Sequence, residues 1–118
     1  MKKESVEKFK KDFPLMFQHE CYFDCGDGWF DILYIMCHTI QSHINFKECP
    51  QVEVVQIKEK FGTLRFYYVG GDKFCEGVVR MGESISACVC ETCGNAGSLR
   101  NNGGWVKTLC DEHYKNGD

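Results

Sequence analysis

Four residues of metal-ligand type, grouped in two close pairs near the end of the chain, constrain its fold more than any other feature. Cys90 and Cys93 form a Cys-x2-Cys pair, and Cys110 and His113 form a Cys-x2-His pair, with sixteen residues between the two pairs. Zinc takes four such donors in a tetrahedron, and a spacing of two residues lets one tight turn supply two of them. Gly94 fits this turn because glycine tolerates positive φ. We therefore predict a zinc ion held by all four residues; the alternatives are a disulfide pair and a chance cluster in a cysteine-rich chain.

The segment between the two pairs predicts a β-hairpin. Residues 98–100 and 105–107 flank the sequence Asn-Asn-Gly-Gly, and Asn-Gly is the strongest short turn signal. A cysteine turn, a hairpin and a final pair that opens a short helix follow one another as in a treble-clef zinc finger. Four protein ligands leave no open position on the metal, so we expect a structural rather than a catalytic ion. We expect Trp105 to anchor this finger on the rest of the chain.

The cysteine count and the charge narrow the cellular context. The chain has 118 residues, nine cysteines and a net charge of −3. Secreted disulfide scaffolds carry paired cysteines and a signal peptide, whereas this N-terminus is charged and lacks an apolar stretch. We therefore expect a cytoplasmic protein with free or metal-bound thiols and no membrane span. A general nucleic-acid binder carries a surplus of basic residues, which this chain lacks.

The residues before the finger predict an α+β core that begins with two helices. Residues 4–12 form an amphipathic pattern, and residues 28–45 carry apolar side chains at three- and four-residue steps. Asp27 is a suitable N-cap for the second of these helices. We expect His38 and His43, which lie off its apolar stripe, to be exposed. The stripe consists of Trp29, Ile32, Leu33, Met36, Cys37, Ile40 and Ile44.

A further helix is predicted between the core and the finger. Asp72 can cap it, and helical steps continue to residue 88 despite two glycines. Because this helix leads directly into the cysteine turn, we expect no flexible linker there. The chain is thus divided into a core of residues 1–88 and a fused finger of residues 89–118. The helical steps are marked by Phe74, Val78, Met81, Ile85 and Cys88.

Residues 52–69 predict a second hairpin that turns at Phe61-Gly62. Strand alternation separates its side chains into an apolar face, which we expect to pack on the long helix, and a polar, basic and partly aromatic face. The apolar face is predicted to hold Val55, Ile57, Leu64, Phe66 and Tyr68. The opposite face is predicted to hold Gln56, Lys58, Lys60, Thr63, Arg65 and Tyr67.

The polar face of this hairpin is a candidate binding surface. The loop holds either two residues (Phe61-Gly62) or four (residues 59–62), and both lengths give the same faces. With the two-residue loop Lys58 and Arg65 should lie opposite each other, and like charges across a strand pair cost about 0.2–1 kcal/mol. A bound anion or an acidic partner would relieve this repulsion. Alternatively, both side chains splay into water, or a glutamate at position 53, 59 or 76 screens them. In the binding interpretation Lys58, Lys60 and Arg65 contact phosphates, and Tyr67 or Trp29 stacks on a base.

A second metal site is an open alternative near the start of the core. His19, Cys21 and Cys25, with help from Cys37 or His38, supply suitable donors. The Cys-x3-Cys spacing is acceptable for zinc but is not diagnostic. Buried thiols also serve as small apolar side chains, which is the competing explanation.

Several motifs together resemble a known group of proteins. In chain order they are Gly26-Asp27-Gly28-Trp29, the Lys-x-Lys-Phe-Gly-x-Leu-Arg-Phe hairpin, the cysteine turn with Gly94, and residues 104–113. This arrangement resembles a family of small, mostly uncharacterised proteins encoded by bacteriophages and prophages, over about residues 25 to 113. The resemblance implies a phage accessory protein in the cytoplasm of an infected bacterium, where such proteins modulate host machinery or block antiviral defence.

The sequence favours a binding protein over an enzyme. It contains no glycine-rich phosphate loop, nucleophile elbow or His-Glu-x2-His helix. We predict a non-catalytic protein that blocks a host component by contacting a host protein or by sequestering a nucleotide-like anionic ligand. The alternative is a zinc-finger DNA-binding transcriptional regulator that uses Arg100 and Lys107. The net charge and the finger's Asp111 and Glu112 weigh against DNA, while self-association and the choice between hairpin and finger as binding face stay open.

Overall fold

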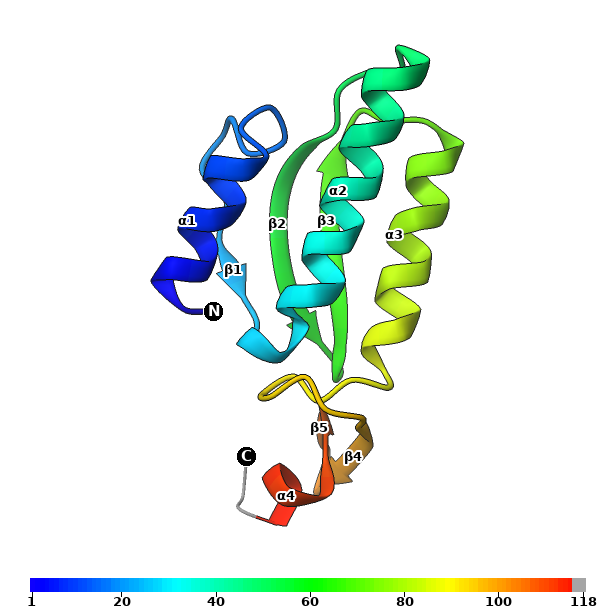
Figure 1. Cartoon of the computed structure of the whole chain (residues 1–118). Coiled ribbons are helices and arrows are strands. Elements are labelled where there is room, and N and C mark those ends of the chain that lie inside the picture. The colour runs from blue at the N-terminus through cyan, green and yellow to red at the C-terminus, as the bar shows by residue number, and fades with distance from the viewer. Residues whose placement is uncertain (116–118) are drawn as a thin grey trace.

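The computed structural model describes residues 1–115, which form the mixed α+β fold that the sequence predicts (Figure 1). The helices are α1 (Lys3–Asp12), α2 (Phe30–Lys47), α3 (Lys73–Ser86) and α4 (Asp111–Lys115), with a 3-10 turn, η1 (Asp27–Trp29), before α2. The strands are β1 (Phe23–Asp24), β2 (Glu53–Lys60), β3 (Thr63–Val69), β4 (Ser98–Asn102) and β5 (Trp105–Leu109). One sheet has the order β1-β2-β3, and β4 pairs with β5 in the finger. Within the described residues, no helix combines the length and the apolar character needed to cross a membrane.

The hairpin of β2 and β3 has the shorter of the two loops that the sequence left open. Phe61 and Gly62 form its two-residue loop, and both have positive φ (53° and 86°), as a tight hairpin turn requires. Lys58 consequently lies opposite Arg65. The sequence did not predict β1, which pairs with β2 in parallel and places Asp24 beside Lys58.

A β-bulge corrects one part of the predicted face assignment. The pairing of β2 with β3 shifts between Val54 and Gln56, so Val55 is an extra residue. Val55 is therefore 53% exposed and Val54 takes its place in the core, which makes the predicted burial of Val55 wrong. The alternation of apolar and polar residues could not show this, because a bulge exchanges the buried and exposed faces for the residues that precede it in the strand. Burial is confirmed for Ile57, Leu64 and Phe66.

Aromatic rings and the apolar stripe of α2 fill the core. Phe9 of α1 is fully buried, and its ring centroid lies 5.0–6.4 Å from those of five other rings. These rings belong to Phe13, Phe17, Phe23, Phe30 and Tyr34. The predicted stripe of α2 is confirmed at Leu33, Met36, Cys37, Ile40 and Ile44, all of which are buried.

The third helix, α3, covers the free edge of β3 with polar side chains. The backbone N–H of Leu64 donates to Ser86 Oγ (2.9 Å), and that of Phe66 donates to Glu83 Oε2 (2.8 Å). Both donors would otherwise lack a partner at the sheet edge. The helix thus protects the sheet from edge pairing and is held by specific hydrogen bonds.

Because polar residues of α3 face the sheet edge, its apolar stripe is turned outward. Phe74, Met81 and Ile85 are 49%, 64% and 44% exposed, and the helix ends at Ser86 rather than at residue 88. The stripe lines an apolar groove of about 640 Å³ between α2 and α3. The buried positions of α3 are instead Cys75, Val79, Gly82 and Ser86.

The finger is attached to the core through the segment before α2. The indole Nε1–H of fully buried Trp29 donates to the carbonyl oxygen of Val89 (2.9 Å). The backbone N–H of Gly28 donates to the carbonyl oxygen of Glu91 (2.8 Å). A Cβ atom at Gly28 would overlap the carbonyl oxygen of Cys90, so only glycine fits. Trp29 is therefore the anchor, and the role predicted for Trp105, which is 71% exposed, is wrong.

A second contact joins the finger to the turn between β2 and β3. The buried hydroxyl of Thr108 donates to the carbonyl oxygen of Gly62 (2.7 Å), and a Cβ atom at Gly62 would crowd the side chains of Leu99 and Val106. In Figure 1 the finger accordingly lies at the end of the core where this turn and the start of α2 meet. Asp27 does not cap α2 as predicted; its Oδ1 accepts a hydrogen bond from the backbone N–H of Lys2 (3.0 Å).

A pair of glycine substitutions tests the joint. We expect Gly28→Ala to lower the free energy of unfolding by about 2 kcal/mol or more, because the new methyl group meets rigid backbone. Gly77→Ala should raise it by about 0.5–1 kcal/mol, since no atom lies within 4 Å of a Cβ there and alanine favours helix. Urea unfolding monitored by circular dichroism measures both changes. Equal stabilities of the two variants would contradict the rigid joint.

Candidate metal centre

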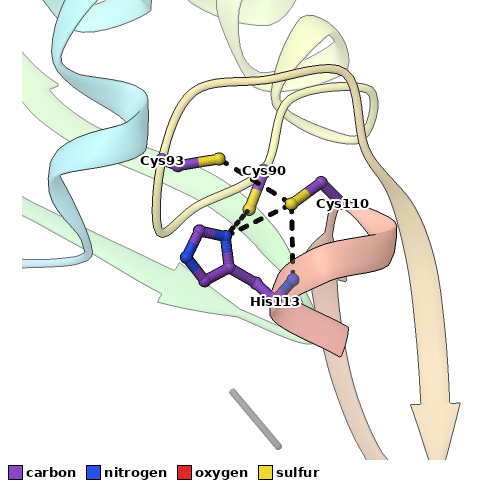
Figure 2. Close-up of side chains that lie close together, drawn as sticks. All are labelled: Cys90, Cys93, Cys110 and His113. Atoms are coloured by element: carbon purple, nitrogen blue, oxygen red, sulfur yellow. Dashed lines mark hydrogen bonds between the residues drawn. The ribbon is translucent and has the colours of Figure 1, made fainter. Parts of the chain in front are cut away.

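The four residues of the predicted zinc site come together in the finger (Figure 2). Cys90 Sγ lies 3.6 Å from His113 Nδ1, Cys110 Sγ lies 3.2 Å from the same nitrogen, and Cys93 Sγ lies 3.8 Å from Cys110 Sγ. Bonds of about 2.3 Å to sulfur and 2.05 Å to nitrogen around a tetrahedral ion separate sulfurs by about 3.8 Å and sulfur from nitrogen by about 3.6 Å. Two of the three separations match these values closely. The cluster can therefore hold a metal ion.

Two local turns aim the ligands at one point. Between Cys90 and Gly94 the chain closes a turn in which the N–H of Gly94 donates to the Cys90 carbonyl oxygen (2.9 Å), with φ of 86° at the glycine. The second turn opens α4, where the N–H of His113 donates to Cys110 Sγ (3.5 Å). Figure 2 shows the first pair reaching from the loop toward the second pair on and beside α4. Sequence spacing predicted both turns.

Backbone dipoles prepare Cys90 to bind a cation. Burial by itself raises the pKa of this fully buried thiol, but backbone N–H groups of Cys110, Cys93 and Thr92 outweigh burial and lower the pKa to about 6. The thiolate, which is the form that binds metals, is therefore favoured at neutral pH. The hydrogen bond with Cys110 raises the pKa of His113.

Arg100 supports the finger internally. Its Nη2–H donates to Asp111 Oδ1 (2.7 Å), its Nε–H donates to the carbonyl oxygen of Leu109 (3.2 Å), and its guanidinium lies over the ring of Tyr114. The residue that the DNA-binding alternative needs is thus engaged between the hairpin and α4. Cysteine turn, hairpin and short helix follow one another as predicted, while the treble-clef assignment and the division at residues 88 and 89 stay predictions. Residues 116–118 of the predicted finger lie outside the described residues.

The predicted binding residues are placed together with one exception. Lys58, Lys60, Arg65 and Tyr67 lie on paired strands, with Tyr67 42% exposed and Arg65 half-buried. Trp29 is fully buried and hydrogen-bonded within the joint, so a ligand in solvent cannot reach its ring. Its predicted stacking role is therefore wrong.

Arg65 also lines a pocket that the sequence analysis missed. The pocket has a volume of about 290 Å³ and lies between the edge of β3 and α3. The Nε atom of Arg65 is buried and has no hydrogen-bond partner. The orientation of α3, which the apolar pattern did not reveal, is what brings Arg80 to this site. The pocket is lined by Thr63, Leu64, Arg65, Arg80, Glu83, Ser84 and Ala87.

The alternative metal site near the start of the core is not formed. Cys21, Cys25 and Cys37 are buried in the apolar core, and burial raises the pKa of Cys21 to about 11 and that of Cys25 to about 12. His19 instead contacts Glu53, with 2.7 Å between Nε2 and Oε1. In the described part of the chain these residues form no cluster of metal-ligand atoms, and the cysteines serve as core side chains.

Comparisons with known proteins assign no family to this chain. It matches no protein-family model, no curated protein and no solved structure. The likeness to phage-encoded proteins therefore stays a prediction. What the chain does has to be argued from its geometry.

A matched pair of cysteine substitutions tests the metal centre. We expect Cys93→Ser to bind one equivalent of metal less than the wild type and to melt at a lower temperature, because one of four donors is lost. Cys88→Ser, which changes an exposed cysteine outside the cluster, should match the wild type in both respects. Elemental analysis and thermal melting before and after chelation measure the difference. Unchanged metal content in Cys93→Ser would exclude this centre.

Proposed function

We propose that the chain is a non-catalytic binding protein, stabilised by a structural zinc ion, that captures a nucleotide-like anionic ligand beside β3. The pocket beside β3, which both Arg65 and Arg80 line, is the observation that carries this proposal. Arg65 is only half-buried and makes no ion pair among the described residues, so its guanidinium group has N–H donors to offer to a ligand. A phosphate group accepts hydrogen bonds from guanidinium groups in a bidentate geometry and suits these donors.

The donor set of the finger supports zinc as the ion. Three cysteine sulfurs and one imidazole nitrogen, the donors that cluster here, are a ligand set of structural zinc sites, which are tetrahedral. The ion would tie the cysteine turn to α4 next to the joint with the core. Its role in the proposal is to hold the scaffold, with no step of chemistry assigned to it.

The charges around the pocket support an anionic ligand. Among the described residues neither Lys58 nor Arg65 makes an ion pair, and Arg80 lies 3.9 Å from Glu76 with both side chains exposed. Glu83 is the one carboxylate that lines the pocket, and it accepts the N–H of Phe66. Two arginines thus outweigh one carboxylate. Hydroxyl groups of Thr63 and Ser84 line the same pocket and add neutral hydrogen-bond partners.

An aromatic ring near the pocket suits a nucleobase. Tyr67 lies two residues after Arg65 on β3, so both side chains project from the same face of the strand, and Tyr67 is 42% exposed. Any of the nucleobases can stack on such a ring, because each has a π-face. We extend the proposal to the biological role implied by the phage resemblance: sequestration of a host signal in the bacterial cytoplasm, which needs affinity and no catalysis.

Charge reversal tests the proposed site. Isothermal titration calorimetry with cyclic dinucleotides, cyclic mononucleotides and ATP should show that the wild type binds one of these compounds. After the protein is denatured, the bound compound should be recovered chemically unchanged. Arg65→Glu combined with Arg80→Glu should weaken its affinity at least tenfold, because both phosphate donors become repulsive. Lys3→Glu combined with Lys47→Glu reverses two charges elsewhere on the surface and should bind like the wild type.

Two outcomes would overturn the ligand assignment. Equal affinity in the double arginine variant and its control would move the site away from this pocket. Absence of nucleotide binding, together with stoichiometric co-purification of one host protein, would replace the anion with a protein partner. A ligand that is chemically altered after incubation would instead contradict the non-catalytic part of the proposal, because it would show that the protein is an enzyme.

A further inference from the structure

A second group of metal-ligand side chains lies at the other end of the core from the finger. It consists of His43 near the end of α2, Cys49 before β2, and Asp72 and Cys75 at the start of α3. One ligand atom from each of the four residues lies within 4.8 Å of the others. Figure 1 shows the end of α2 and the start of α3 side by side, at the end opposite α4.

The backbone brings these segments together. The N–H of Gly71, which precedes α3, donates to the carbonyl oxygen of Pro50 (2.9 Å), directly after Cys49. Gly70 and Gly71 have positive φ (84° and 76°), a conformation that favours glycine. The approach of Cys49 to Cys75 therefore follows from a hydrogen-bonded turn and does not depend on a metal.

His43 and Asp72 form an oriented pair inside the group. Their Nε2 and Oδ2 atoms lie 2.7 Å apart, and the imidazole stacks on Phe74 with 4.1 Å between centroids. The other carboxylate oxygen, Oδ1, accepts the N–H of Cys75 (3.2 Å) and caps α3. The prediction that His43 is exposed is wrong, because its side chain is only 15% exposed. Histidine–aspartate pairs are also found in proteins at positions that bind no metal. This pair differs because the thiols of Cys49 and Cys75 lie within 4.8 Å of it.

We propose that His43, Cys49, Asp72 and Cys75 form a second binding site for a divalent transition metal of the zinc type. Two thiolates and an imidazole select zinc-like ions over magnesium or calcium, which prefer oxygen. Nitrogen and oxygen donors on one tetrahedral ion lie about 3.4 Å apart, so the Asp72 carboxylate must withdraw slightly from His43 as the metal enters. Its side chain is 37% exposed, which leaves it room to move.

The two sites differ in ways that separate them experimentally. Each site has one imidazole. The finger adds three sulfurs from two tight turns, whereas this group adds two sulfurs and one carboxylate from three separate segments. Its ion would tie the end of α2 to the start of α3. We expect it to be released to a chelator before the ion of the finger, since fewer thiolates hold it.

Metal counting with single substitutions tests the site. Reduced protein is saturated with Zn²⁺ or Co²⁺, freed of excess metal, and analysed for metal per chain. Cys49→Ser should bind one equivalent less than the wild type, and Cys88→Ser should equal the wild type. Combining Cys49→Ser with Cys93→Ser should remove both equivalents. In the Co²⁺-loaded wild type, five thiolates would bind metal, three in the finger and two in this site. The thiolate-to-metal charge-transfer absorption of Cys49→Ser should therefore be lower by about two fifths.

A milder variant keeps the test valid if a cysteine change disturbs folding. Asp72→Asn preserves the cap of α3, because asparagine is an equally good N-cap, but removes the carboxylate donor. Affinity for this metal should fall at least tenfold with an unchanged circular dichroism spectrum. Equal metal content in Cys49→Ser and the wild type would overturn the site. A Cys49–Cys75 disulfide in protein purified without oxygen would overturn it as well and assign the pair to redox chemistry.

Discussion

The contact between residues 26–29 and residues 89–91 is the constraint on which the rest of the structure depends. It joins the start of the long helix to the first metal-ligand pair through backbone groups that are hydrogen-bonded across the joint. Glycine at position 28 permits this approach, and the buried indole of Trp29 fixes its direction. A change in this contact would therefore affect both the start of α2 and the candidate metal centre.

The motifs that suggested a protein family gather at this joint. The Gly-Asp-Gly-Trp turn, the glycine of the β2–β3 turn, the cysteine turn and Thr108 all lie where finger and core touch. Their physical role is to let backbones approach closely and to satisfy buried polar groups. The proposed ligand pocket lies along the edge of β3, where it is lined by Leu64 and Arg65 of the hairpin motif and by residues of α3 outside these motifs.

The edge of β3 explains both the pocket and the groove. Ser86 and Glu83 satisfy the N–H groups of the strand, so α3 presents its polar side to the sheet. That orientation brings Arg80 close to Arg65 and exposes the apolar stripe beside α2. The two hydrogen bonds at the sheet edge and the exposure of three large apolar side chains are thus consequences of one orientation of α3.

Residue spacing alone determined the candidate metal ligands of the finger, the long helix with its buried stripe, and the position of the β2–β3 hairpin. Each follows from a local rule: donors two residues apart in a turn, apolar steps along a helix, and β-branched and aromatic residues on both sides of Phe61-Gly62. Tertiary structure decided the bulge at Val55, the rotation of α3, the burial of Trp29, the pairing of β1, and the meeting of His43 with Cys49 and Cys75. These features depend on contacts between segments distant in sequence, where hydrogen bonds at a sheet edge or a joint compete with apolar burial, and no local pattern records the outcome of that competition.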